Sequence, residues 1–189
     1  MAEDVSAGSG EVQSAAGAGP GIEARLNSFL AGQLGRPVAV TGLRQFPSGF
    51  SWITYGFELP APGIDGITDL ILRIGPSNGL YAPYSAEPQF AALRAVQDSD
   101  VPAPRGLFWS DDPAILGDPF FLSEKSLGEA PIPWGNEDGL GDTQRQRLGE
   151  QFADILGALH AIDWTRTDLA KFGAGATLAN AAARQIDIW

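Results

Sequence analysis

Two places in the first half of the chain carry residues suited to holding a phosphate group. Gly49 lies in a predicted turn, where backbone N–H groups can approach an anion closely, and Ser48 and Ser51 add hydroxyl donors. Arg73 lies in the apolar run 70–74, and its planar guanidinium donates paired hydrogen bonds and stays charged when desolvated. Simpler explanations stay open for both: a plain hairpin turn at Gly49, and a solvent-facing strand position for Arg73.

The other residues that could do acid–base chemistry are typical of structural positions. His160, the only histidine, lies on a predicted helix near Asp163, which favours a structural hydrogen-bond partner over a catalytic base. The acidic pairs 111–112 and 137–138 lie in turns, where carboxylates form local hydrogen bonds. No Gly-x-x-x-x-Gly-Lys-Ser/Thr motif occurs, which excludes a P-loop, and without Gly-x-Ser-x-Gly a hydrolase has little support.

Composition narrows the class of protein further. The net charge of −11 over 189 residues argues against a nucleic-acid-binding surface, which needs clustered Lys and Arg. The absence of Cys excludes disulfides, zinc–thiolate sites and a Cys nucleophile. No apolar run approaches the roughly 20 residues of a membrane helix. Because no basic residue precedes Arg25 and no apolar segment follows the start, a secretion signal is not expected, and the cytoplasm is the expected location.

Hydrophobic periodicity predicts an α+β arrangement. A first helix is marked by Ile22, Leu26, Leu30 and Leu34 and ends at Gly35. Strands are predicted where apolar residues alternate or cluster, and a second helix is predicted where the period lengthens. Together these give an antiparallel sheet of about five strands with one helix inserted after the third. The predicted strands are 38–46, 53–59, 70–75 and two that bracket the Asp112–Pro113 turn; the inserted helix is 86–97.

Three regions are predicted along the chain. Residues 1–21 are mostly Ala, Gly, Ser and acid, which is typical of a disordered tail. Residues 22–125 contain the predicted sheet. Residues 126–189 begin with a Pro- and Gly-rich linker and continue with a strongly amphipathic helix near 143–160; the last segment, 178–189, is again helical in pattern. The apolar face of the amphipathic helix comprises Leu148, Phe152, Ile155, Leu156 and Leu159.

Four motifs in this order resemble the aminoglycoside phosphotransferase and choline kinase-like family, over about residue 21 to the end. The resemblance implies a protein-kinase-like N-lobe with an inserted helix, followed by a hinge and the first helices of an incomplete C-lobe. The motifs are Leu70-Ile71-Leu72-Arg73, Val101-Pro102-Ala103-Pro104-Arg105, Asp112-Pro113-x-x-Leu116-Gly117-x-Pro119-Phe120, and Leu156-Gly157-Ala158-Leu159-His160-Ala161-x-Asp163-Trp164.

The resemblance also implies a nucleotide site, with ATP and Mg²⁺ as cofactors. Arg73 would grip the phosphates, and the turn of Ser48, Gly49, Phe50 and Ser51 would cover them. Ser123, Glu124 and Lys125 would seat adenine through backbone groups. An acid on the inserted helix would orient Arg73. Glu87 and Gln89 are the two residues near that position, and the sequence leaves the choice between them open.

The family's catalytic loop, His-x-Asp followed by Asn, does not occur in these 189 residues. The resemblance places it after the last residue, so no catalytic residue and no metal ligand is assigned, and little or no turnover is expected of this chain alone. The expected partners are a nucleotide and a small-molecule phosphate acceptor of unknown identity. An incomplete C-lobe also predicts an exposed apolar helix face and self-association. The alternative is a non-catalytic nucleotide-binding or protein-interaction module.

Overall fold

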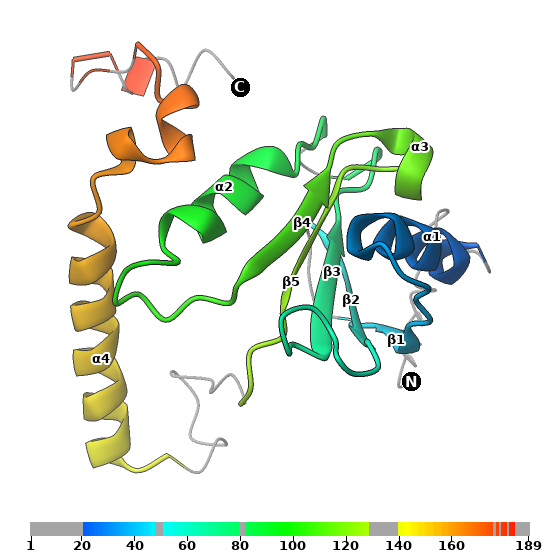
Figure 1. Ribbon diagram of the computed structural model, residues 1–189. Helices are drawn as coiled ribbons and strands as arrows, with labels where there is room; N and C mark the ends of the chain where they lie inside the picture. Colours follow the sequence, from blue (N-terminus) through cyan, green and yellow to red (C-terminus); the bar gives the residue numbers. More distant parts are fainter. Residues whose placement is uncertain are drawn as a thin grey trace, which may run out of the picture.

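A five-stranded antiparallel sheet forms the centre of the computed structural model, which describes residues 21–47, 51–79, 82–128, 140–175, 177, 179–180 and 182–183 (Figure 1). The strand order is β1-β2-β3-β5-β4, and every neighbouring pair is antiparallel. The inserted helix follows the third strand, as predicted. The strands are β1 (Thr41–Gln45), β2 (Ile53–Glu58), β3 (Asp69–Ile74), β4 (Gly106–Ser110) and β5 (Phe120–Glu124).

Helices cover both faces of this sheet. Helices α1 and α3 lie on one face and α2 on the other (Figure 1). The left-handed Gly35, with φ of 62°, follows the last residue of α1, as predicted for its end. The helices are α1 (Ile22–Leu34), α2 (Glu87–Ala95), α3 (Pro113–Leu116) and α4 (Asp142–His160), followed by two 3₁₀ turns, η1 (Trp164–Arg166) and η2 (Asp168–Lys171).

The larger core lies between the sheet and α1. Side chains of a strand alternate between faces, so Leu70, Leu72 and Ile74 of β3 all point to this side. Leu26 and Leu30 of α1 are fully buried against them. This core therefore fixes which face of β3 is left for the residues between, 71 and 73. Its fully buried side chains are Leu26, Leu30, Leu59, Leu70, Leu72, Phe120 and Leu122.

A smaller apolar cluster lies on the opposite face, under α2. Its buried members are Trp52, Ala86 and Phe121. The rings of Trp52 and Phe121 meet edge to face, with centroids 5.3 Å apart. Tyr84, Phe90, Leu93 and Trp109 pack around them. We call this group the α2-side cluster. The Arg73 side chain lies against its member Phe121.

The α2-side cluster leaves no room for a side chain at Gly75. A Cβ atom at this position would lie 2.5 Å from the Cβ of Tyr84, whose ring packs against Trp52. We expect Gly75→Ala to lower the free energy of unfolding by roughly 1–3 kcal/mol, measured by urea denaturation. Gly32→Ala is the control, because a Cβ there meets nothing within 4 Å and an exposed helix position favours Ala. Equal stabilities of the two variants would contradict the close contact with Tyr84.

Several boundaries differ from the predictions. Strand β1 begins at Thr41 rather than residue 38. The Asp112–Pro113 turn is the start of the single-turn helix α3, where Asp112 accepts a hydrogen bond from the Ala114 N–H at 2.9 Å. The 3₁₀ turns after α4 were not predicted. Three predicted segments lie wholly or mostly outside the described residues: the tail 1–21 except Gly21, residues 129–139 of the linker 129–141, and most of the segment 178–189.

Helix α4 spans nearly the predicted residues but has no buried side chain. Figure 1 shows it standing away from the sheet, on the side of α2. Phe152 is 68% exposed, and the other large apolar side chains of the helix are also exposed. The predicted exposed apolar face is therefore present. None of the described helices is both long and apolar enough to cross a membrane.

Candidate nucleotide site

Arg73 projects from β3 toward the α2 side of the sheet. Its strand neighbours are Thr54 on β2 and Phe121 on β5. The guanidinium carbon lies 5.8 Å from the centre of the Phe121 ring, a cation–π distance. The side chain is half-buried, which excludes the solvent-facing position that the sequence had left open.

The charge on Arg73 has no protein counter-charge in the described part of the chain. Its Nε atom is buried and has no hydrogen-bond partner. The described ion pairs all involve other residues. Desolvation by burial lowers the pKa of Arg73, but arginine starts so far above neutrality that the group stays charged. A half-buried cation with an unused donor is a group that a bound anion would stabilise.

A hollow of about 240 Å³ lies on the same sheet face as Arg73. Asp69 of β3 lines it and stands four residues before Arg73, which is about 13 Å along a strand. Gly56 of β2 lines it too, and a Cβ there would come within 2.9 Å of the Phe46 ring. Because Gly56 has no side chain, the sheet surface at this position stays open and forms part of the hollow. The lining residues are Gly42, Arg44, Gly56, Phe57, Glu58, Asp69 and Lys125.

The segment predicted to seat adenine enters this hollow at Lys125. Ser123 is buried within β5. The Glu124 N–H donates to the Arg105 carbonyl at 2.9 Å, so this donor is already used. The Lys125 N–H donates to the Asp69 carbonyl at 3.0 Å, and the Lys125 ammonium lies 3.7 Å from the Asp69 carboxylate. The sheet therefore takes up the N–H groups of both residues.

Unused backbone groups begin one residue later. Residues 126–128 make no hydrogen bond in the described part of the chain, and Leu127 is 92% exposed. Sequence reasoning missed these residues, because the position at which a strand stops pairing depends on its neighbours in the sheet. The only signal in the sequence was Gly128, whose φ of 111° marks the end of the extended segment.

The turn between β1 and β2 is described only in part. Ser48, Gly49 and Phe50, which we predicted to cover phosphates, lie outside the described residues. Ser51 is half-buried and makes no hydrogen bond within the described part of the chain. Trp52, directly after it, is buried in the α2-side cluster. The described end of the turn is thus anchored beside Arg73.

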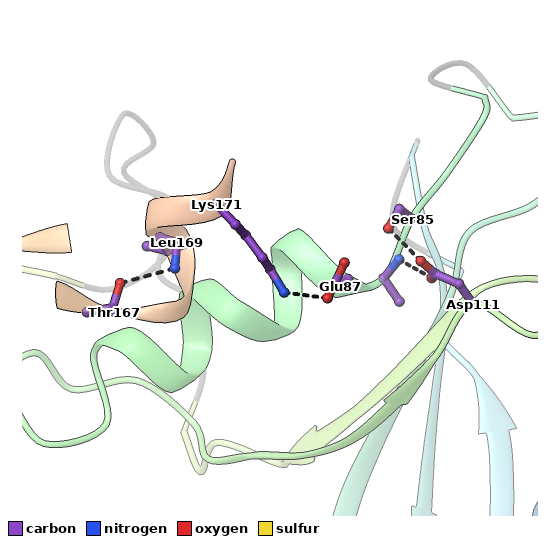
Figure 2. A network of polar contacts seen from close by, with 7 residues as sticks. Ser85, Glu87, Asp111, Thr167, Leu169 and Lys171 are labelled. Carbon is purple, nitrogen blue, oxygen red and sulfur yellow. Dashed lines mark hydrogen bonds and ion pairs between the residues drawn. The ribbon is translucent and has the colours of Figure 1, made fainter. Parts of the chain in front are cut away.

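The structure gives Glu87 a different partner from the one considered. Glu87, the first residue of α2, pairs with Lys171 of η2, as Figure 2 shows. Gln89, the alternative, is exposed and forms no hydrogen bond in the described part of the chain. Neither residue reaches Arg73 in this arrangement. The ion pair instead ties the start of α2 to the segment that follows α4.

Comparison with known proteins identifies the family. Residues 42–187 match the model of the family described as "Phosphotransferase enzyme family". The chain belongs to this family. Its fold agrees with a crystal structure of a candidate aminoglycoside phosphotransferase from Ralstonia eutropha JMP134, with a TM-score of 0.64 at 20% identity. The kinase-like α+β fold predicted from the sequence is thereby confirmed.

Relatives of this phosphotransferase-family chain are longer proteins. It is 29% identical over 154 residues to acyl-CoA dehydrogenase family member 10 of Mus musculus, covering 78% of this chain and 13% of that protein. It is 23% identical over 173 residues to family member 11 of Homo sapiens, covering 89% and 20% respectively. The match to the Ralstonia structure covers 88% of this chain and 45% of that one.

The remaining acid–base candidates in this phosphotransferase-family chain are Asp111, Asp112 and His160, and they differ in their hydrogen bonds. Asp112 bonds locally, as predicted. Asp111 does not: it accepts from the Ser85 hydroxyl and the Ala86 N–H, both at 2.6 Å, across more than twenty residues of sequence. His160 is exposed and has no hydrogen-bond partner within the described residues, so its expected structural pairing is not found.

The described residues do not fit a magnesium ion. No group of three or more His, Asp or Glu side chains in the described part of the chain is arranged to hold a metal. Magnesium prefers several oxygen ligands in octahedral geometry. No magnesium ligand is therefore assigned among the described residues.

Proposed function

We propose that this chain forms the ATP-binding part of a kinase that transfers the γ-phosphoryl group of ATP to a hydroxyl of a small molecule. The observation that carries the proposal is Arg73, a half-buried cation with a buried, unused Nε donor. Membership of the phosphotransferase family supports the reaction class. The phosphate acceptor is proposed only as a small molecule that bears a hydroxyl.

The two ends of the site suit the two ends of a nucleotide. The hollow at Gly56 and Lys125 offers a surface for the base, and the backbone of residues 126–128 offers its hydrogen-bond partners. Arg73, about 13 Å along β3, suits the phosphates. The proposed adenine contacts are therefore the backbone groups of residues 126–128 in place of those of Ser123, Glu124 and Lys125.

The proposed role of these residues is to position the nucleotide and neutralise its charge. Phosphoryl transfer leaves the protein little covalent chemistry, so catalysis depends on alignment and electrostatics. Arg73 would hold phosphate oxygens through paired hydrogen bonds, which its guanidinium can donate without deprotonation.

Calorimetric titration of the chain with ATP tests this function. We expect Arg73→Ala to weaken ATP binding roughly 10- to 100-fold, the value of a lost hydrogen-bonded charge contact. Arg94→Ala is the matched control, because Arg94 is an exposed arginine on α2 that bonds Gln97. Equal affinities of the wild type and Arg73→Ala would rule out the proposed site.

We also propose that the chain self-associates through α4. Leu148, Ile155, Leu156 and Leu159 are 37–42% exposed and Phe152 is 68% exposed. A hollow of about 570 Å³ lies beside this strip, lined by Leu140, Leu148, Phe152 and Ile155 among others. A continuous apolar surface of this kind gains free energy when a second surface covers it.

A further inference from the structure

We propose that Asp111 is a positioning residue for Arg73, acting through the start of α2 and the α2-side cluster. The inference rests on the proposed function, since it assigns to Asp111 a part in phosphate binding at that site. Asp111 lies directly after β4 and touches neither Arg73 nor the hollow in the described contacts. Its influence therefore has to pass through other residues, and three contacts provide the route.

The first contact fixes the start of α2. This helix has no N-cap side chain of its own, because the residue at that position is Ala86. Asp111 instead holds the N-cap residue itself: one carboxylate oxygen accepts from the Ala86 N–H and the other from the Ser85 hydroxyl, both at 2.6 Å (Figure 2). A carboxylate at a helix N-terminus also interacts favourably with the helix dipole.

The second contact joins Ala86 to the cluster beneath it. The Ala86 side chain is fully buried, and it packs with Trp52 and Phe121. In a close-packed interior, a shift of the Ala86 backbone displaces these neighbours as well. The hydrogen bond to Asp111 therefore fixes the height of the α2 start above the Phe121 ring.

The third contact is between Phe121 and Arg73. The two residues lie opposite each other on neighbouring strands, and the guanidinium carbon is 5.8 Å from the ring centroid. Because the Arg73 Nε has no hydrogen-bond partner, the ring is the only described contact that orients the charged group. A change in the packing of Phe121 therefore changes where the guanidinium points.

A second contact holds the start of α2, at the residue after Ala86. Glu87 pairs with Lys171, but both side chains are partly exposed, 34% and 51% respectively. Exposed ion pairs contribute little and are screened by salt. Asp111 is exposed as well, but it bonds two groups, and its hydrogen bond to the Ala86 N–H at the helix start is partly buried, so we assign the main positioning effect to it.

A double-mutant cycle between Asp111 and Arg73 tests the proposal. ATP and adenosine affinities are measured by calorimetry for the wild type, Asp111→Ala, Arg73→Ala and the double variant. We expect Asp111→Ala to weaken ATP binding roughly three- to tenfold and to leave adenosine binding unchanged, because only ATP uses Arg73. In the Arg73→Ala background the same change should have no further effect on ATP. A residue with a merely structural role would weaken both ligands and act independently of Arg73.

Asp112→Ala is the matched control. The neighbouring carboxylate also accepts a backbone N–H, but from Ala114 of α3 rather than from α2. It should leave ATP affinity unchanged. Asp111→Asn should retain most of the affinity, because its amide oxygen can still accept from Ala86 and its amide nitrogen can donate to the Ser85 hydroxyl.

Ala86→Gly provides a second test that keeps both hydrogen bonds. It removes only the buried methyl group between Asp111 and the cluster, and it should also weaken ATP binding while sparing adenosine. Equal losses of ATP affinity from Asp111→Ala with and without Arg73, or equal losses for ATP and adenosine, would overturn the positioning role. If Arg73→Ala itself leaves ATP affinity unchanged, the proposed function fails instead, so the two failures are distinct.

Discussion

Replacing Arg73 by methionine is expected to stabilise the unliganded protein by about 1 kcal/mol while weakening ATP binding roughly 10- to 100-fold. The two effects have opposite signs because the same feature causes both. Without a ligand, the folded protein holds a partly desolvated charge whose buried Nε has no hydrogen-bond partner among the described residues. With ATP bound, that charge would meet phosphate oxygens.

Methionine suits this experiment because it fills a similar volume without charge. Its flexible thioether can lie on the Phe121 ring, where the guanidinium lies now. The α2-side cluster should therefore keep its packing, and only the desolvation cost is removed.

The sign of the pH dependence follows from the lowered pKa of Arg73. Burial makes the folded state hold this proton less tightly than the unfolded state does, so the charged group destabilises the fold. Arginine stays protonated throughout the physiological range, and the cost is therefore present at every pH in that range. The stability gain of Arg73→Met should be the same at acidic and at neutral pH.

Urea denaturation with and without ATP measures both effects in one variant. The wild type should gain stability when ATP is added, by linkage, and Arg73→Met should gain almost none at the same concentration. A loss of stability in unliganded Arg73→Met would show that the charge is compensated within the protein. Arg94→Met is the control, since this exposed arginine has no desolvation cost to remove.

The second large effect is expected on the apolar face of α4. We expect the wild-type chain to self-associate with rising concentration and Phe152→Lys to shift it strongly toward the monomer. Phe152 is the most exposed apolar side chain of the helix, at 68%, and lies in the middle of the strip. A charge there would lose its hydration in an apolar interface. The free energy of that desolvation exceeds the free energy gained by burying the two apolar surfaces.

Sedimentation velocity and binding of a hydrophobic dye measure this effect. Gln146→Lys is the matched control, because it adds the same charge on the polar side of the helix, where Gln146 bonds Glu150. It should leave both the sedimentation profile and the dye signal unchanged. A wild-type chain that stays monomeric at high concentration and binds no dye would contradict self-association through α4.

Local features of the sequence determined the element order and the faces of the strands. Because side chains of a strand point to its two faces in turn, Leu70, Leu72 and Ile74 share the face of the larger core and Arg73 lies on the other. Gly35 marked the end of α1. These features are predictable because side-chain direction in a strand and the left-handed end of a helix follow from backbone geometry alone.

Only the tertiary structure decided which distant groups meet. The sequence indicates a turn residue at Asp111, yet its carboxylate accepts the N–H of Ala86, directly before α2, from more than twenty residues away. Glu87 bonds Lys171, which is 84 residues further along the chain. Residues 126–128 make no hydrogen bond with other described residues because the pairing with Asp69 and Arg105 ends at Lys125. Such contacts depend on how whole elements pack in three dimensions. A short stretch of sequence does not specify which element will lie beside it.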